Sequence, residues 1–184
     1  MDLVEITAPA FDVDIDLKYA GADNFTGKPV YRRAACYLHK DAAEALQRVI
    51  TLAAKIGKRF KIFDAFRPSE AQLVLWTHTP NPDFLADPKE GSPHSRGVAV
   101  DVTLVDSEGR ELEMGTGFDE FRPRSYHAAT DISQDAQWNR LLLLGLMTAA
   151  GWNFYPNEWW HYQLFNAHSD YPLLSDEAVP DGMM

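Results

Sequence analysis

The segment Ser92-Pro-His94-Ser-Arg-Gly97-Val-Ala99-Val-Asp101-Val-Thr-Leu-Val105 is the part of the sequence from which the fold can be predicted most directly. From Gly97 to Val105 the residues are almost all apolar, which predicts a strand. Two residues of this segment carry reactive groups: His94 ends the preceding loop, and Asp101 lies inside the strand. The segment therefore predicts both a strand and part of a functional site.

Further strands are expected on both sides of this segment. Residues 13–19 alternate between apolar and polar side chains, as in a half-buried strand. Residues 60–66 are typical of a buried strand. Residues 153–165 are rich in aromatic side chains and predict a strand pair that turns near Pro156-Asn157.

Helices are expected between these strands. A capping box formed by Asp41 and Glu44 predicts the start of a helix that ends at Gly57. A short helix over residues 69–77 and a longer one over residues 133–151 are each expected to be capped by their first residue, a serine.

Two long segments are expected to be irregular. Residues 79–93 contain four prolines and one glycine, and residues 106–132 are broken by several glycines and a proline. No linker or repeat divides the chain. The sequence therefore predicts an α+β fold, with a single domain over residues 1–184 and a mainly antiparallel sheet flanked by helices.

The composition of the chain limits which binding partners and which cellular compartment are expected. The net charge of −10 disfavours binding to nucleic acid and to anionic membranes. Cys36 is the one cysteine, so no disulfide can form within the chain. The N-terminal residues lack the pattern of a secretory signal, and the longest apolar stretch is too short to span a bilayer. We expect a soluble, cytoplasmic protein, with a homo-oligomer left open.

A metal site is predicted from two distant segments. His94, Asp101 and His161 supply two imidazoles and one carboxylate, the ligand set of a catalytic zinc ion that keeps one position open. Taken separately, the His94 and Asp101 pair could be a structural hydrogen bond, and Glu158-Trp-Trp-His161 could be a strand end with core aromatics. Their conjunction favours one zinc ion per chain.

Glu158 is the predicted base of this site. Zinc lowers the pKa of a bound water from about 15.7 to about 7, and a nearby carboxylate can take the proton and pass it to a leaving amine. On a regular strand, residues 158 and 161 would face opposite sides. We therefore expect Glu158 on the turn before the strand and His161 on the strand.

The pattern of these residues resembles that of a known family. Ser92, His94, Gly97, Ala99 and Asp101, followed by Glu158, Trp160 and His161, are similar to the motif of VanX-type D-alanyl-D-alanine dipeptidases, in the zinc D,D-peptidase superfamily that includes the Hedgehog domain. The stretches Asp64-Ala-Phe-Arg67-Pro68 and Met114-Gly-Thr-Gly-Phe-Asp119 are similar as well. The similarity runs from about residue 10 to residue 166.

This resemblance implies a function and further site residues. It implies hydrolysis of the D-alanyl-D-alanine dipeptide by a metal-activated water, with Glu158 as general base. It also implies that Arg67 stabilises the tetrahedral intermediate, and that Asp119 and Ser92 bind the substrate amine. The chemistry is consistent, because a free dipeptide carries an ammonium group and its hydrolysis creates an oxyanion.

Two alternatives remain at this point. A murein D,D-carboxypeptidase or endopeptidase would use the same zinc on a longer substrate, and it would need an open groove. A non-catalytic zinc-binding domain would need no base. Glu158 distinguishes the catalytic from the non-catalytic reading.

Overall fold

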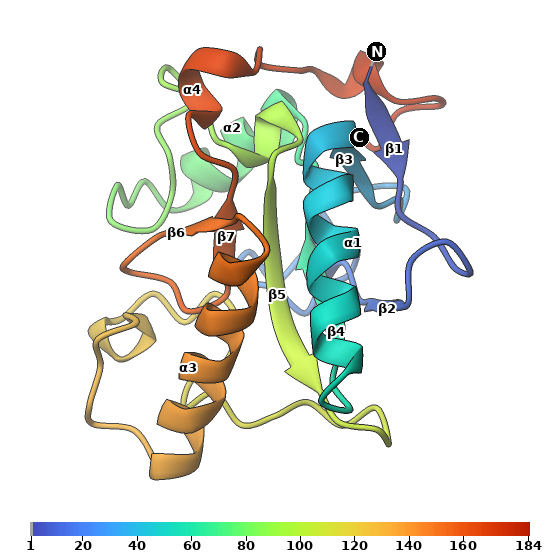
Figure 1. Cartoon of the computed structure of the whole chain (residues 1–184). Coiled ribbons are helices and arrows are strands. Elements are labelled where there is room, and N and C mark those ends of the chain that lie inside the picture. The colour runs from blue at the N-terminus through green and yellow to red at the C-terminus, as the bar shows by residue number, and fades with distance from the viewer. Residues whose placement is uncertain (1) are drawn as a thin grey trace.

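The computed structural model describes residues 2–184, and its centre is a five-stranded sheet in the order β2-β4-β5-β7-β6 (Figure 1). The strands are β2 (Val13–Ile15), β4 (Arg59–Asp64), β5 (Ala99–Val105), β6 (Asn153–Phe154) and β7 (His161–Gln163). The β2–β4 pair is parallel, and the other three pairs are antiparallel. The predicted α+β class with a mainly antiparallel sheet is confirmed.

The other regular elements surround this sheet. A two-stranded antiparallel sheet joins β1 (Leu3–Glu5) to β3 (Tyr37–His39). The α-helices are α1 (Lys40–Ala54), α2 (Ser69–His78), α3 (Gln134–Ala149) and α4 (Ala167–Asp170). Short 3-10 helices lie at Lys18–Ala20, His94–Arg96, Pro123–Ser125 and Asp176–Ala178. None of the helices within residues 2–184 combines the length and apolarity needed to cross a bilayer.

Strand β5 lies at the middle of the sheet and is buried along its whole length. Its even-numbered residues Val100, Val102 and Leu104 belong to the main core, together with Leu46 of α1 and Leu143 of α3. Figure 1 shows α1 and α3 running alongside β5 and β4. Because side chains alternate along a strand, Asp101 must point to the opposite face. The functional residues gather on that face.

The structure corrects three predicted local features. The strand expected over residues 13–19 ends at Ile15, and a 3-10 turn follows it. Helix α1 is capped by His39, whose Nδ1 accepts a hydrogen bond from the backbone N of Asp41 at 3.3 Å, so the capping box at Asp41 is wrong. Ser69 does not cap α2, because its hydroxyl donates instead to the carbonyl of Leu174 at 2.8 Å.

Other local predictions are confirmed. Ser133 caps α3 by accepting a hydrogen bond from the backbone N of Ala136 at 3.0 Å. The turn between β6 and β7 contains Pro156 and Asn157, and residues 79–93 and 106–132 contain little regular structure. The C-terminal segment packs into a second core through Val179 and Met183.

Candidate metal centre

Three adjacent strands place three polar residues in one row. Asp101 on β5 is the register partner of Asp64 on β4 and of His161 on β7. A register irregularity between Ile62 and Asp64 separates the Asp64 pairing from the regular β4–β5 ladder. The carboxylate of Asp101 therefore has an acidic neighbour, Asp64, on one adjacent strand and an imidazole neighbour, His161, on the other.

The fourth group, His94, comes from the loop that leads into β5. It begins a 3-10 turn that ends at Gly97, whose φ of 70° is in the left-handed region. A Cβ at this glycine would lie 2.7 Å from Leu3 Cδ2 and 3.1 Å from the backbone N of His39. Only glycine fits this turn without strain, and the turn brings the imidazole of His94 back over the strand that follows it.

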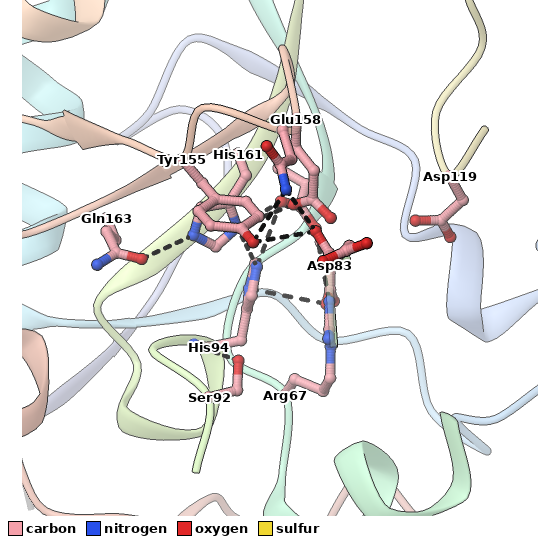
Figure 2. A network of polar contacts seen from close by, with 12 residues as sticks. Arg67, Asp83, Ser92, His94, Asp119, Tyr155, Glu158, His161 and Gln163 are labelled. Atoms are coloured by element: carbon pink, nitrogen blue, oxygen red, sulfur yellow. Dashed lines mark hydrogen bonds and ion pairs between the residues drawn. The ribbon is translucent and has the colours of Figure 1, made fainter. Parts of the chain in front are cut away.

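The predicted ligands His94, Asp101 and His161 lie together, with one ligand atom of each within 4.8 Å of the others. Figure 2 shows His94 beside His161. Nε2 of His94 is 3.1 Å from Nδ1 of His161, and Oδ1 of Asp101 is 3.2 Å and 3.1 Å from these two nitrogens. All three side chains are buried. Two imidazole nitrogens and one carboxylate oxygen that are directed toward the same point form the donor set of a zinc site.

The far nitrogen of each imidazole has its own partner. Nδ1 of His94 lies 2.7 Å from the carbonyl of Ala65, and Nε2 of His161 lies 3.0 Å from Oε1 of Gln163. Each acceptor favours the tautomer in which the nitrogen that faces the cluster is unprotonated and able to bind a metal. Sequence reasoning missed Gln163, although its position two residues after His161 on β7 places both side chains on the same face of the strand.

The charge of the cluster also suits a cation. Burial by itself would raise the pKa of Asp101, but the adjacent His94 and His161 lower it below its usual range, so the carboxylate is ionised. An ionised oxygen and two imidazole lone pairs within 4.8 Å of one another are strongly stabilised by a shared divalent ion. The residues present therefore fit the predicted metal.

Glu158 lies on the turn before β7, as predicted from its spacing to His161. Its Oε2 is 3.8 Å from Nδ1 of His161, and its side chain is buried. Burial raises the pKa of Glu158, and the charges of Asp101 and Asp119 raise it further, while Arg67 opposes them. A carboxylate with a raised pKa next to a metal cluster is well suited to take up a proton.

Arg67 lies next to the metal cluster, and its guanidinium is held in place by several contacts. Its Nε donates to Asp64 at 2.8 Å, its Nη1 donates to Oε1 of Gln72 at 2.8 Å, and its Nη2 lies 3.5 Å from Oδ2 of Asp101. The guanidinium also lies over the ring of Tyr19, 5.0 Å from the centroid. Burial opposes its charge, but Asp64 raises the pKa of Arg67, so it stays protonated. Gln72 was not expected from the sequence.

The two predicted substrate-binding residues lie on opposite sides of the site. Ser92 is buried beside the metal cluster, where its Oγ accepts a hydrogen bond from the backbone N of His94 at 3.2 Å. Asp119 stands apart from the cluster in Figure 2, on the segment after β5, and accepts a hydrogen bond from the hydroxyl of Tyr19 at 2.9 Å. Its φ of 58° is in the left-handed region.

All of the predicted site residues line one cavity, whose volume is about 330 Å³. Besides the predicted site residues, its wall includes Pro82, Phe84, Leu85 and Ala86 of the loop over residues 79–93. The loop is tied to both sides of the site. The carbonyl of Asp83 accepts hydrogen bonds from the hydroxyl of Tyr155 and from Nδ2 of Asn157, both at 3.0 Å. The carbonyl of Ala86 accepts one from Nε2 of Gln72 at 2.8 Å.

The chain is similar to several known proteins. A family model described as D-ala-D-ala dipeptidase matches residues 1–177. The D-alanyl-D-alanine dipeptidase of Escherichia coli is 47% identical over 176 residues, which cover 96% of this chain and 91% of that protein. The D-alanyl-D-alanine dipeptidase of Enterococcus faecium is 36% identical over 184 residues, covering 86% of this chain and 91% of that protein. A crystal structure of a mutant of the vancomycin-resistance D,D-pentapeptidase VanY in complex with Zn(II) aligns with a TM-score of 0.47 and 16% identity, over 72% of this chain and 75% of that chain.

Proposed function

This chain belongs to the D-ala-D-ala dipeptidase family, and on that premise we propose that it hydrolyses the free dipeptide D-alanyl-D-alanine with a zinc ion held by His94, Asp101 and His161. The observation that carries the proposal is the convergence of three ligand atoms within 4.8 Å of one another, with a fourth group, the carboxylate of Glu158, beside them. Bound zinc would supply a Lewis acid that lowers the pKa of water and polarises the peptide carbonyl.

Glu158 acts as general base and then as general acid in this proposal. Its buried carboxylate lies 3.8 Å from the nearest ring nitrogen of His161, so it is beside the metal ligands without being one of the three that converge. It removes a proton from the attacking water and delivers that proton to the nitrogen of the leaving D-alanine. A non-catalytic zinc-binding domain has no need of such a base.

Arg67 stabilises the charge that develops on the carbonyl oxygen. Its guanidinium is fixed by Asp64 and Gln72 before substrate arrives, so little reorganisation is needed when the oxyanion forms. The third nitrogen of the guanidinium, Nη2, is directed toward the metal cluster and lies 3.5 Å from Oδ2 of Asp101. The guanidinium contributes most in the transition state, where binding energy accelerates the reaction.

Asp119 and Ser92 bind the amino end of the substrate. Both residues line the cavity that contains the metal ligands. A free dipeptide carries an ammonium group there, and a carboxylate in a partly desolvated wall pairs with it strongly. Ser92 offers a hydroxyl at the end of the same cavity, next to His94.

The size of the cavity supports a small substrate. Its volume of about 330 Å³ is near the lower end of the range for small-molecule sites. One wall is formed by Pro82, Phe84, Leu85 and Ala86, and the hydrogen bonds of Asp83 and Ala86 hold this wall against the rest of the site. A longer peptide needs an open groove, so this wall favours a dipeptide over the murein substrates considered above.

The test is a substrate panel on purified protein. We expect D-alanyl-D-alanine to be hydrolysed much faster than L-alanyl-L-alanine and faster than a pentapeptide that ends in D-alanyl-D-alanine. Chelation should abolish the activity, and added zinc should restore it. Preferential cleavage of the pentapeptide would replace the proposal with a carboxypeptidase, and zinc binding without any turnover would replace it with a binding domain.

Two further expectations belong to this proposal. A cytoplasmic location suits hydrolysis of a free dipeptide, and cell fractionation tests it. A homo-oligomer stays a prediction from the sequence, and light scattering on the purified protein tests it.

A further inference from the structure

Arg140 is a buried arginine outside the cavity wall described above. It lies on α3, its residue is 3% exposed, and it takes part in none of the ion pairs recorded within residues 2–184. Burial lowers the pKa of Arg140 to about 10, with the charge of Asp131 opposing that shift. Burying a guanidinium without a carboxylate partner is costly, so the groups it does contact are informative.

Two of these groups are the carbonyls at the ends of one loop segment. Nε of Arg140 donates to the carbonyl of Met114 at 2.6 Å, and Nη1 donates to the carbonyl of Tyr126 at 2.9 Å. The segment between these carbonyls, residues 114–126, has one 3-10 turn as its only regular structure and carries Asp119. A single guanidinium therefore closes the base of the loop that holds this carboxylate.

The third group is the hydroxyl of Thr116, which connects several parts of the structure. Nη2 of Arg140 lies 3.4 Å from this oxygen, and the indole Nε1 of Trp159 donates to it at 2.8 Å. The hydroxyl is also 3.1 Å from Oγ of Ser125, which donates to the carbonyl of Glu120 at 2.6 Å. The chain of contacts thus reaches the residue that follows Asp119.

The same contacts reach the base. Trp159 is buried and immediately follows Glu158 in the chain. Its backbone N donates to the carbonyl of Ser125 at 3.0 Å, and the guanidinium of Arg140 lies 5.8 Å from the centroid of its ring. The loop that carries Asp119 and the turn that carries Glu158 are therefore joined through one partly buried polar network.

We propose that Arg140 and Thr116 are positioning residues that hold the Asp119 loop in register with the Glu158 turn. The inference rests on the proposed function, because it takes Asp119 as the site of the substrate ammonium and Glu158 as the base. The dipeptide spans the two, so its peptide bond reaches Glu158 only when both segments keep their relative placement. A loop that moves from this placement weakens the contact between Asp119 and the substrate ammonium, so the loss is expected mainly in KM.

The backbone at Asp119 explains why positioning is needed. Its φ of 58° is in the left-handed region, which a residue other than glycine adopts only at a cost in backbone energy. An irregular loop would relax from that conformation if nothing opposed it. The anchors at Met114, Thr116 and Tyr126 supply that opposition.

The first test uses kinetics with Thr116→Val, which keeps the shape of the side chain and removes the hydroxyl, and Arg140→Lys, which keeps the charge. Thr130→Val is the matched control, because Thr130 is an exposed threonine of the neighbouring segment. We expect KM for D-alanyl-D-alanine to rise about 10-fold in both test variants, with a smaller change in kcat and no change in the control. The rise in KM should vanish when either variant is combined with Asp119→Asn. An equal rise in the Asp119→Asn background would overturn the inference.

The second test is independent of the substrate. Hydrogen–deuterium exchange of residues 114–126 should accelerate about 10-fold in Thr116→Val and Arg140→Lys and stay unchanged in Thr130→Val, while α1 and β5 keep their protection. Unchanged exchange in both test variants would overturn the inference, whichever substrate the enzyme takes. Absence of D-alanyl-D-alanine hydrolysis by the unmodified protein would instead overturn the proposed function, and with it the kinetic part of the inference.

Discussion

Asp101 and His161 face each other across the antiparallel strands β5 and β7, with Oδ1 of the first 3.1 Å from Nδ1 of the second. Strand register fixes this distance, because the two residues are direct partners in the ladder. A shift of one residue would turn one of the two side chains to the helix-covered face. The metal site is therefore built into the sheet, and a loop needs to supply only His94.

Replacement of the base should separate metal binding from catalysis. Glu158→Gln keeps the shape of the side chain and leaves His94, Asp101 and His161 in place. We expect the zinc content to be unchanged and kcat to fall by about 100- to 10,000-fold, which is the usual contribution of a general base. Metal analysis and steady-state kinetics on the same sample provide the check. Full activity in this variant would show that another group removes the proton.

The hydrogen bond from His161 to Gln163 should tune metal affinity. Gln163→Leu removes the acceptor at 3.0 Å that fixes the ring, so we expect zinc affinity to fall by about 10- to 100-fold. Gln163→Glu supplies an acceptor again and should recover most of the loss. Competition with a chromophoric chelator measures both values. Equal affinity in all three proteins would mean that the ring is held by packing alone.

Asp119 should reduce the stability of the metal-free protein at neutral pH. Burial raises its pKa well above the usual value, and the charge of Asp101 adds to this, while the hydrogen bond from Tyr19 opposes it. The folded protein then keeps the Asp119 proton to a higher pH than the unfolded chain. The stability contribution of this group is complete below about pH 4, the unfolded value, and is lost as the pH rises through the folded value.

Asp119→Asn removes this titration and keeps an oxygen that can accept the hydrogen bond of Tyr19. We expect a higher urea midpoint than in the unmodified protein at pH 7, and a difference that shrinks as the pH is lowered toward 4. Urea titrations at several pH values, with zinc removed, measure it. A constant difference across that range would show that the charge of Asp119 is not the cause.

The sequence predicts the parts of the molecule whose pattern is local. The mostly apolar run from Gly97 to Val105 predicts β5, which begins at Ala99, and the spacing from Glu158 to His161 correctly predicts a turn followed by a strand. The cap at Ser133 follows from local chemistry and is confirmed. Ser69 has the same chemistry, yet its hydroxyl bonds to Leu174, more than 100 residues away in the chain, and no local rule indicates that contact.

The parts of the site that the sequence did not predict depend on contacts that no local pattern indicates. Gln72 on α2 contacts Arg67, which lies five residues earlier in the chain, and Arg140 on α3 contacts the loop that carries Asp119. Gln163 is an exception, since a glutamine two residues after a predicted ligand on a strand shares its face. A search for hydrogen-bonding residues at that spacing would have found it.

The guanidinium of Arg67 should be needed as a rigid fork and not only as a positive charge. Arg67→Lys keeps a cation near Asp64, which avoids an unpaired buried carboxylate, but an ammonium cannot contact Asp64 and Gln72 while also directing a donor toward the metal cluster. We expect kcat to fall by about 100- to 1,000-fold, the range observed when one oxyanion donor is lost, with KM and zinc content little changed. Gln72→Glu is a second variant to compare with it. The new carboxylate can still accept from Arg67, but it cannot donate to the carbonyl of Ala86. A lysine variant whose loss appeared mainly in KM would indicate that Arg67 binds the ground-state substrate instead of the transition state.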